Sequence, residues 1–235
     1  MDKIRWELSR FNVFFTGKYN TIYDVEEDIN TLYGSSNFSG LDSVDWFLLN
    51  KKNNNLSFVL LSVPSSFCND EQDFEQFEIE RLIHLELDDC IHNFVKKVIM
   101  QEKAFFSLKR NQLIVSSNIS SAFYKVKISD DLYFLLNSER DYVGFLLENS
   151  TENIVGYSSP VNNTLFNELL LRMMNLCNDK AYDAMDDQDE KYLIMLNELE
   201  KDCLSEQHRD ARISEIRIFI KNSKSTFYDI DEDND

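Results

Sequence analysis

The sequence predicts an α+β protein, with an antiparallel sheet or meander and packed helices, followed by a helical C-terminal region. Short β-type runs separated by Asn-rich turns fill its middle. Apolar residues then recur with helical spacing further along the chain. Hydrophobic residues make up 43% of the 235 residues, which is enough for a real core. We divide the chain into an α+β domain over 1–158, a helical region over 159–228 and an acidic tail over 229–235.

The first elements include one clear hairpin. Residues 5–16 alternate loosely and fit either a strand or a short helix, and 24–32 resemble a short acidic helix. The runs 44–49 and 56–63 flank an Asn/Lys turn and predict a β-hairpin over 44–63. Its second run is apolar without alternation, which is typical of a strand covered on both faces.

A helix with at most one break is expected next, over 70–101. Five apolar residues in it are spaced by four, four, three and four positions, which places them on one helical face. They are Ile83, Leu87, Ile91, Phe94 and Val98.

The β-rich middle and the C-terminal part complete the prediction. We expect an antiparallel meander of strands at 104–108, 113–116, 123–128, 132–136, 142–147 and 154–157. Amphipathic patterns then predict helices at 165–176 and 189–204. Residues 211–221 fit either a strand or a helix.

Acidic residues are concentrated in three blocks. The formal net charge is −18, from 42 acidic and 24 basic residues. Residues 70–90 carry nine acidic residues and one basic residue. Residues 178–210 carry eleven acidic and four basic residues, and residues 229–235 carry five acidic residues and no basic one. The remainder of the chain is therefore nearly neutral. Such a protein repels nucleic-acid phosphate and attracts basic surfaces.

The first two blocks supply the candidate partner-binding residues. Their carboxylates would complement Lys and Arg side chains on a basic macromolecule. The candidates are Glu75, Glu78, Asp88, Asp89, Asp186, Asp187, Asp189 and Glu190. We predict no catalytic residue, no metal ligand and no cofactor.

Other binding chemistry is poorly represented. The five glycines form no phosphate-binding loop, which argues against P-loop and Rossmann enzymes. The four cysteines are scattered and are expected to be reduced and mostly buried. Only the stretch 212–224 is basic enough to contact nucleic acid directly, through Arg212, Arg217, Lys221 and Lys224.

The hairpin resembles the central hairpin of PD-(D/E)XK nucleases. In that family an Asp on the first strand and an E-x-K motif on the second hold a metal ion and activate water. Asp45 in 44–49 matches the family Asp, whereas Ser62 and Pro64 in 59–65 stand where Glu and Lys would fall. The resemblance implies a degenerate, catalytically inactive core.

These patterns favour a non-enzymatic acidic protein that binds a basic partner, as immunity proteins, antitoxin-like inhibitors and DNA-mimic inhibitors do. The alternative is a non-catalytic subunit of a bacterial or phage antiviral defence complex, with the apolar helix at 165–176 as its interface. A metal-dependent enzyme using Asp45, Asp130 and Asp131 stays open as a third possibility. No signal-like segment or run of ~20 apolar residues is present, so we expect a cytoplasmic protein without membrane contact.

Overall fold

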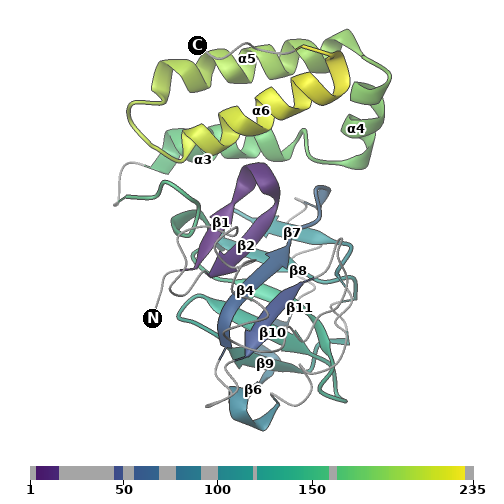
Figure 1. The fold of residues 1–235 in the computed structure, drawn as a ribbon, viewed down its shortest axis with the longest axis vertical. Coiled ribbons are helices and arrows are strands. Elements are labelled where there is room, and N and C mark those ends of the chain that lie inside the picture. Colours follow the sequence, from purple (N-terminus) through teal and green to yellow (C-terminus); the bar gives the residue numbers. More distant parts are fainter. Residues whose placement is uncertain are drawn as a thin grey trace.

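The computed structural model describes residues 4–15, 45–49, 56–68, 78–90, 100–118, 121–158 and 163–230. These residues form two β-sheets and four α-helices, which confirms the α+β class (Figure 1). The helices lie together across one end of the two sheets, and the C-terminal region is helical as predicted.

The smaller sheet is antiparallel and contains the predicted hairpin. Its strands follow the order β1-β2-β4-β3. They span Arg5–Glu7 (β1), Asn12–Phe15 (β2), Trp46–Leu49 (β3) and Leu56–Ser62 (β4). The consecutive residues Phe58 and Val59 are both buried, so β4 is covered on both faces as expected. The ambiguous start of the chain forms two strands, joined by a 3₁₀ turn at Leu8–Arg10 (η1).

The larger sheet has seven described strands in the order β5-β7-β8-β11-β10-β9-β6. They span Phe67–Cys68 (β5), Ile83–Leu85 (β6), Ala104–Ser107 (β7), Gln112–Val115 (β8), Tyr124–Lys127 (β9), Leu132–Leu136 (β10) and Tyr142–Leu147 (β11). Strands β9, β10 and β11 form an antiparallel meander, and β8 pairs with β11. The outer strands β5 and β6 are parallel to their neighbours, so this sheet is mixed.

The close antiparallel pairing of β8 with β11 explains why residue 144 is a glycine. Gly144 has a φ of +147°, and a Cβ placed there would lie 2.0 Å from the carbonyl oxygen of Val115. A side chain at this position would therefore push β11 away from β8.

Two predicted elements are wrong. Within the expected helix over 70–101, the described residues form two 3₁₀ turns, Ile79–Arg81 (η2) and Leu87–Asp89 (η3), with β6 between them. The parallel pairing of β6 with β9 overrides the local helical spacing. The expected strand at 154–157 contributes a single bridge, from Ile154 to Trp6. The predicted helix over 24–32 lies outside the described residues.

Four α-helices follow in the described C-terminal part. They span Asn163–Met174 (α3), Asp179–Asp186 (α4), Glu190–Glu206 (α5) and Ile213–Tyr228 (α6). The ambiguous stretch 211–221 is therefore helical, because Ile213, Ile216 and Ile220 are buried on one face while Ile218 is exposed.

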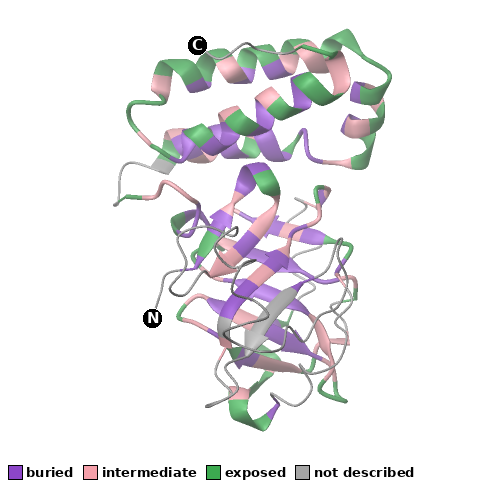
Figure 2. Ribbon diagram, in the orientation of Figure 1, coloured by how far each residue is buried: buried purple, intermediate pink, exposed green. Residues whose placement is uncertain are grey.

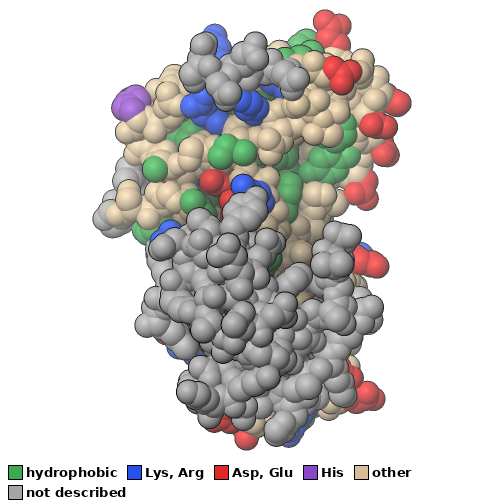
Figure 3. All heavy atoms as spheres, in the orientation of Figure 1, with side chains coloured by type: hydrophobic (Ala, Val, Ile, Leu, Met, Phe, Trp, Pro, Cys, Tyr) green, Lys and Arg blue, Asp and Glu red, His purple; other side chains and the backbone are tan. Residues whose placement is uncertain are grey.

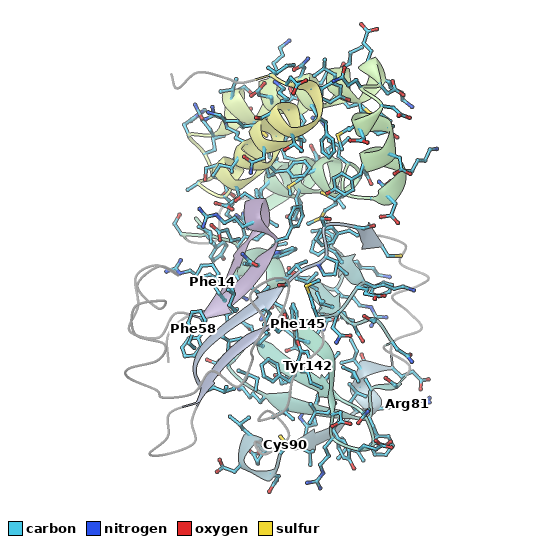
Figure 4. The ribbon with its side chains drawn as sticks, turned by 45° about the vertical axis from the view of Figure 1, so that its right-hand side comes forward. Phe14, Phe58, Arg81, Cys90, Tyr142 and Phe145 are labelled. Carbon is cyan, nitrogen blue, oxygen red and sulfur yellow. The ribbon has the colours of Figure 1, made fainter. Side chains whose placement is uncertain are left out.

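One hydrophobic core joins both sheets to the helical layer. Trp6 and Val13 of the small sheet, Phe145 of the large sheet and Leu170 of α3 all belong to it. Buried residues line the inner sides of the layers, whereas the outer faces of the helices are exposed (Figure 2). Phe14 and Phe58 lie on the side of the small sheet that faces away from Phe145 (Figure 4).

Phe11 has a backbone conformation that is unusual for a bulky residue. Its φ and ψ are 52° and 49°, and its N–H donates to the carbonyl of Leu8 at 3.3 Å to close η1. Its ring packs against Phe67 and Phe219. The left-handed region costs an L-residue with a Cβ roughly 1–2 kcal/mol, so packing holds this turn in place.

We expect Phe11→Gly to be more stable than Phe11→Ala by about 1 kcal/mol, although Gly is usually the less stable of the two replacements. Both variants lose the aromatic ring, but only Gly avoids the energetic cost of the left-handed conformation. Urea unfolding of the two variants measures the difference. A more stable Ala variant would show that residue 11 does not have a positive φ in solution.

Candidate functional site

The strongest charged feature is a row of carboxylates around the connection between α4 and α5. We name it the acid edge. It comprises Asp179, Asp183, Asp186, Asp187, Asp189 and Glu190, all of them exposed. Acidic side chains gather along the α4 end of the helical layer, while basic ones lie towards its other end (Figure 3). Four of the predicted partner-binding residues, from Asp186 to Glu190, are thus brought together.

The connection that carries the acid edge is held by defined hydrogen bonds. Asn178 caps α4 by accepting from the N–H of Ala181 at 3.0 Å, and Asp189 caps α5 by accepting from the N–H of Lys191 at 2.8 Å. The Tyr228 hydroxyl at the end of α6 donates to the carbonyl of Asp189 at 2.9 Å. The carboxylates therefore project from a fixed scaffold.

Charge in the acid edge is not compensated by the described part of the chain. None of its six carboxylates forms an ion pair with a described residue. Asp189 and Glu190 lie at the N-terminus of α5, which favours negative charge. Asp183 and Asp186 lie in the last turn of α4 and Asp187 is its C-cap, where the helix dipole disfavours negative charge. These three acids are therefore expected to reduce the stability of the helical layer.

A pocket of about 320 Å³ opens beside the acid edge, and we name it the aromatic pocket. It lies between η1, the segment after β4, and helices α4 and α6. Its aromatic lining residues are Phe11, Tyr182, Phe219 and Phe227. Its other lining residues are polar and uncharged: Ser9, Ser65, Asn222, Ser223 and Thr226. Hydrophobic side chains gather there next to the acidic α4 end (Figure 3).

Tyr182 links the aromatic pocket to the acid edge. It lies on the same face of α4 as Asp179 and Asp186, at spacings of three and four residues. Its hydroxyl donates to the carbonyl of Ser65 at 3.0 Å. Burial above all, and then the neighbouring Cys177 thiol, raises the pKa of Tyr182 above its usual value, with the Asp179 carboxylate as the smallest contribution.

A buried carboxylate lies behind the pocket wall. The backbone N–H and hydroxyl of Ser9 both donate to Oε2 of Glu215, at 3.2 and 2.8 Å. Glu215 is only 5% exposed and forms no ion pair with a described residue. This pair ties the N-terminal hairpin to α6.

The first acid block lies at the far end of the large sheet, and its described members are on 3₁₀ turns instead of the expected helix. Glu78 pairs with Arg81, and Arg140 donates to the carbonyl of Asp89 at 3.0 Å. Asp88 is exposed on η3. Arg81 and Cys90 mark this end in Figure 4, away from the helices. The fourth candidate residue of the block, Glu75, lies outside the described residues.

Asp45, the residue that matches the nuclease Asp, is buried at the start of the hairpin. Its two carboxylate oxygens accept from the N–H of Ser62 at 2.7 Å and from the hydroxyl of Tyr142 at 2.9 Å. Burial raises its pKa from 3.8 to about 7, although both hydrogen bonds act in the opposite direction. Asp45 thus joins the small sheet to β11, and both of its oxygens already have partners.

No metal-binding group was found in the described part of the chain. There, no three His, Cys, Asp or Glu side chains cluster closely enough to hold an ion. Asp131, the other strand-end candidate, accepts from the amides of Asn149 and Asn153 at 2.8 and 3.0 Å. Asp130 pairs with Lys127 at 3.2 Å.

The predicted basic stretch is not a surface patch. Arg212 is 1% exposed and bound to Asp210, and Lys224 is 3% exposed and paired with Glu200. Two of the four basic residues expected to be available to nucleic acid are therefore buried, and only Arg217 and Lys221 remain partly exposed.

The apolar helix at 165–176 is also covered. Most of its apolar residues pack into the protein's own core, so it does not provide the free interface expected of it. Phe166, Leu169, Leu170, Met173 and Met174 are all 2% exposed or less. The four cysteines are free and three are buried, as predicted. No helix in the described ranges has the length and apolar character of a membrane span.

The acid edge is predictable from the sequence, whereas the aromatic pocket is not. Its lining residues come from four separate stretches, around residues 9–11, 65, 182 and 219–227. No short motif links them, so only the folded chain brings them together. No model of a known protein family matches this chain, and no curated protein matches its sequence.

Proposed function

We propose that this is a non-enzymatic acidic protein that docks onto a basic macromolecular partner through the acid edge. An inhibitor, such as an immunity or antitoxin-like protein or a DNA mimic, is the class that this chemistry fits best. The observation that carries the proposal is the uncompensated charge at the C-terminal end of α4. Carboxylates that reduce stability and have no described partner of their own are suited to a basic surface elsewhere.

The first acid block supports the proposal less well. Its Glu78 is already paired with Arg81, and Arg140 lies against the backbone of Asp89. The two groups lie at opposite ends of the molecule (Figure 1), so one small partner surface cannot cover both.

We expect the triple variant Asp183→Lys, Asp186→Lys, Asp187→Lys to lose the partner and to unfold at a higher temperature. Lysine suits the C-terminal end of a helix, and each change is worth about 0.3–1 kcal/mol at an exposed site. Asp189 is left unchanged because its cap is worth roughly 1 kcal/mol. The wild-type protein and the triple variant are each used as bait to capture partners from an extract of the source organism. Calorimetry then measures the Kd of the captured partner at several salt concentrations.

The matched control reverses three exposed acids of the other block, Glu86, Asp88 and Asp89, and so makes the same change in net charge. It should retain the captured partner. Equal loss in both variants would mean that net charge alone governs the interaction. Retention of the partner by the α4 variant, or capture of no basic protein at all, would refute the proposal.

A further inference from the structure

We propose that the aromatic pocket receives an arginine side chain of the basic partner. This inference rests on the proposed function and adds to it a specific anchor beside the acid edge. Three independent features of the pocket support a guanidinium group as its occupant.

The first feature is charge. The pocket has no charged lining residue, and its volume of about 320 Å³ is at the lower end of the ~300–1,000 Å³ of ligand sites. Asp179 and Asp186 lie about one helical turn from Tyr182 on α4, and the buried Glu215 accepts a hydrogen bond from the lining residue Ser9. A cation in the pocket would therefore have carboxylates next to two of its lining residues.

The second feature is the aromatic wall. Four rings line the pocket, and a planar guanidinium stacks on aromatic faces better than an ammonium does. The same chemistry is already present inside this fold. The guanidinium carbon of Arg212 lies 3.9 Å from the ring centre of Phe166 and 5.0 Å from that of Tyr157.

The third feature is the supply of hydrogen-bond acceptors. A guanidinium has five N–H donors and no acceptor. The Ser9 hydroxyl proton is committed to Glu215, so its oxygen can only accept from a ligand. Ser223 is 5% exposed, and no described residue hydrogen-bonds to its hydroxyl. Asn222 and Thr226 add exposed polar groups at the rim. A purely apolar side chain would bury these groups without partners.

The test titrates the full chain with the peptide Ac-Gly-Arg-Gly-amide and follows the resonances of the pocket residues by NMR. We expect saturable binding in the millimolar range, as is usual for a single side chain. The citrulline peptide has the same shape without the charge and should bind at least about tenfold more weakly. The lysine peptide should lie between them.

A matched pair of variants tests the location. Thr226→Lys places a cation at the rim and should weaken binding of the arginine peptide about tenfold or more, because the lysine ammonium would repel the guanidinium. Ser225→Lys makes the same change at the neighbouring exposed residue, which does not line the pocket, and should alter binding less than about twofold.

A second pair tests the ring. Phe227→Leu keeps an apolar wall but removes the aromatic face, and should weaken the arginine peptide about fivefold. Phe123→Leu is the control, because Phe123 is an exposed aromatic residue whose carbonyl accepts from the N–H of Ile83 in β6 and which does not line the pocket. It should leave the affinity unchanged.

Three results would overturn the inference: equal affinity for the arginine and citrulline peptides, tighter binding of a tyrosine peptide, or no saturable shift up to about 20 mM peptide. Its failure is distinguishable from failure of the proposed function. Suppose that the captured partner no longer binds the triple Lys variant of α4 but binds Thr226→Lys normally. This result would refute the arginine anchor in the pocket and would still support binding through the acid edge.

Discussion

Replacing Arg212 with Ala is expected to lower the free energy of unfolding by about 3–5 kcal/mol, because it leaves a nearly buried carboxylate without its cation. Three contacts from Arg212 to Asp210 span 2.5–3.1 Å, and its Nη1 donates to the carbonyl of Thr151 at 2.9 Å. It also stacks against Phe166 of α3. One side chain thus joins the start of α6 to the loop after β11 and to another helix.

The matched control is Arg172→Ala. Arg172 also pairs with an aspartate, Asp202, at 2.6 Å, but the two side chains are 41% and 52% exposed. Surface pairs of this kind are worth about 0–1 kcal/mol, so this variant should unfold almost as the wild type does. Urea denaturation measures both. Similar losses in the two variants would show that Arg212 is not buried as described.

Replacing Asp45 with Asn is expected to remove a pH dependence of stability. The folded-state pKa of about 7 is higher than the ordinary value of 3.8. Between these values the folded protein keeps a proton that the unfolded chain has lost, so stability falls as pH rises. The loss approaches about 4 kcal/mol by neutral pH, at 1.4 kcal/mol per pKa unit.

The measurement compares the free energies of unfolding of wild type and Asp45→Asn from about pH 4 to 8. The difference between the two curves should change with pH, and the Asn variant should gain in relative stability as pH rises. Tyr142→Phe is the opposing variant, because it removes a donor that lowers the pKa of Asp45. In Tyr142→Phe, the pH-dependent decrease in the free energy of unfolding should therefore continue above pH 7. Parallel curves for wild type and Asp45→Asn would show that Asp45 is not buried in solution.

The local sequence pattern was sufficient to predict strands whose pairing partners are close in sequence. Strands β10 and β11 begin and end where predicted, because polar turns bound an apolar run on each side. The hairpin of β3 and β4 was predicted for the same reason. Each pairing is between consecutive segments, so the information lies within a short stretch of chain.

Long-range pairing is where the sequence misled. Ile83 fits a helical stripe, yet it is 47% exposed on β6, where it pairs in parallel with Tyr124. A parallel neighbour leaves no local signal. The candidate site divides in the same way. The charge of the acid edge could be read from composition, but its uncompensated position at the end of α4 and the pocket beside it depend on tertiary contacts.

The hydrogen bonds between Ser9 and Glu215 join residues 206 positions apart. During synthesis at about 5–20 residues per second, the N-terminal hairpin is made roughly 10–40 s before the helix that holds it. Phe219, against which Phe11 packs, is also made that much later. Strands β1 and β2 are therefore synthesised first but gain their contacts with α6 last. Both the pocket and the core are complete only when α6 is in place.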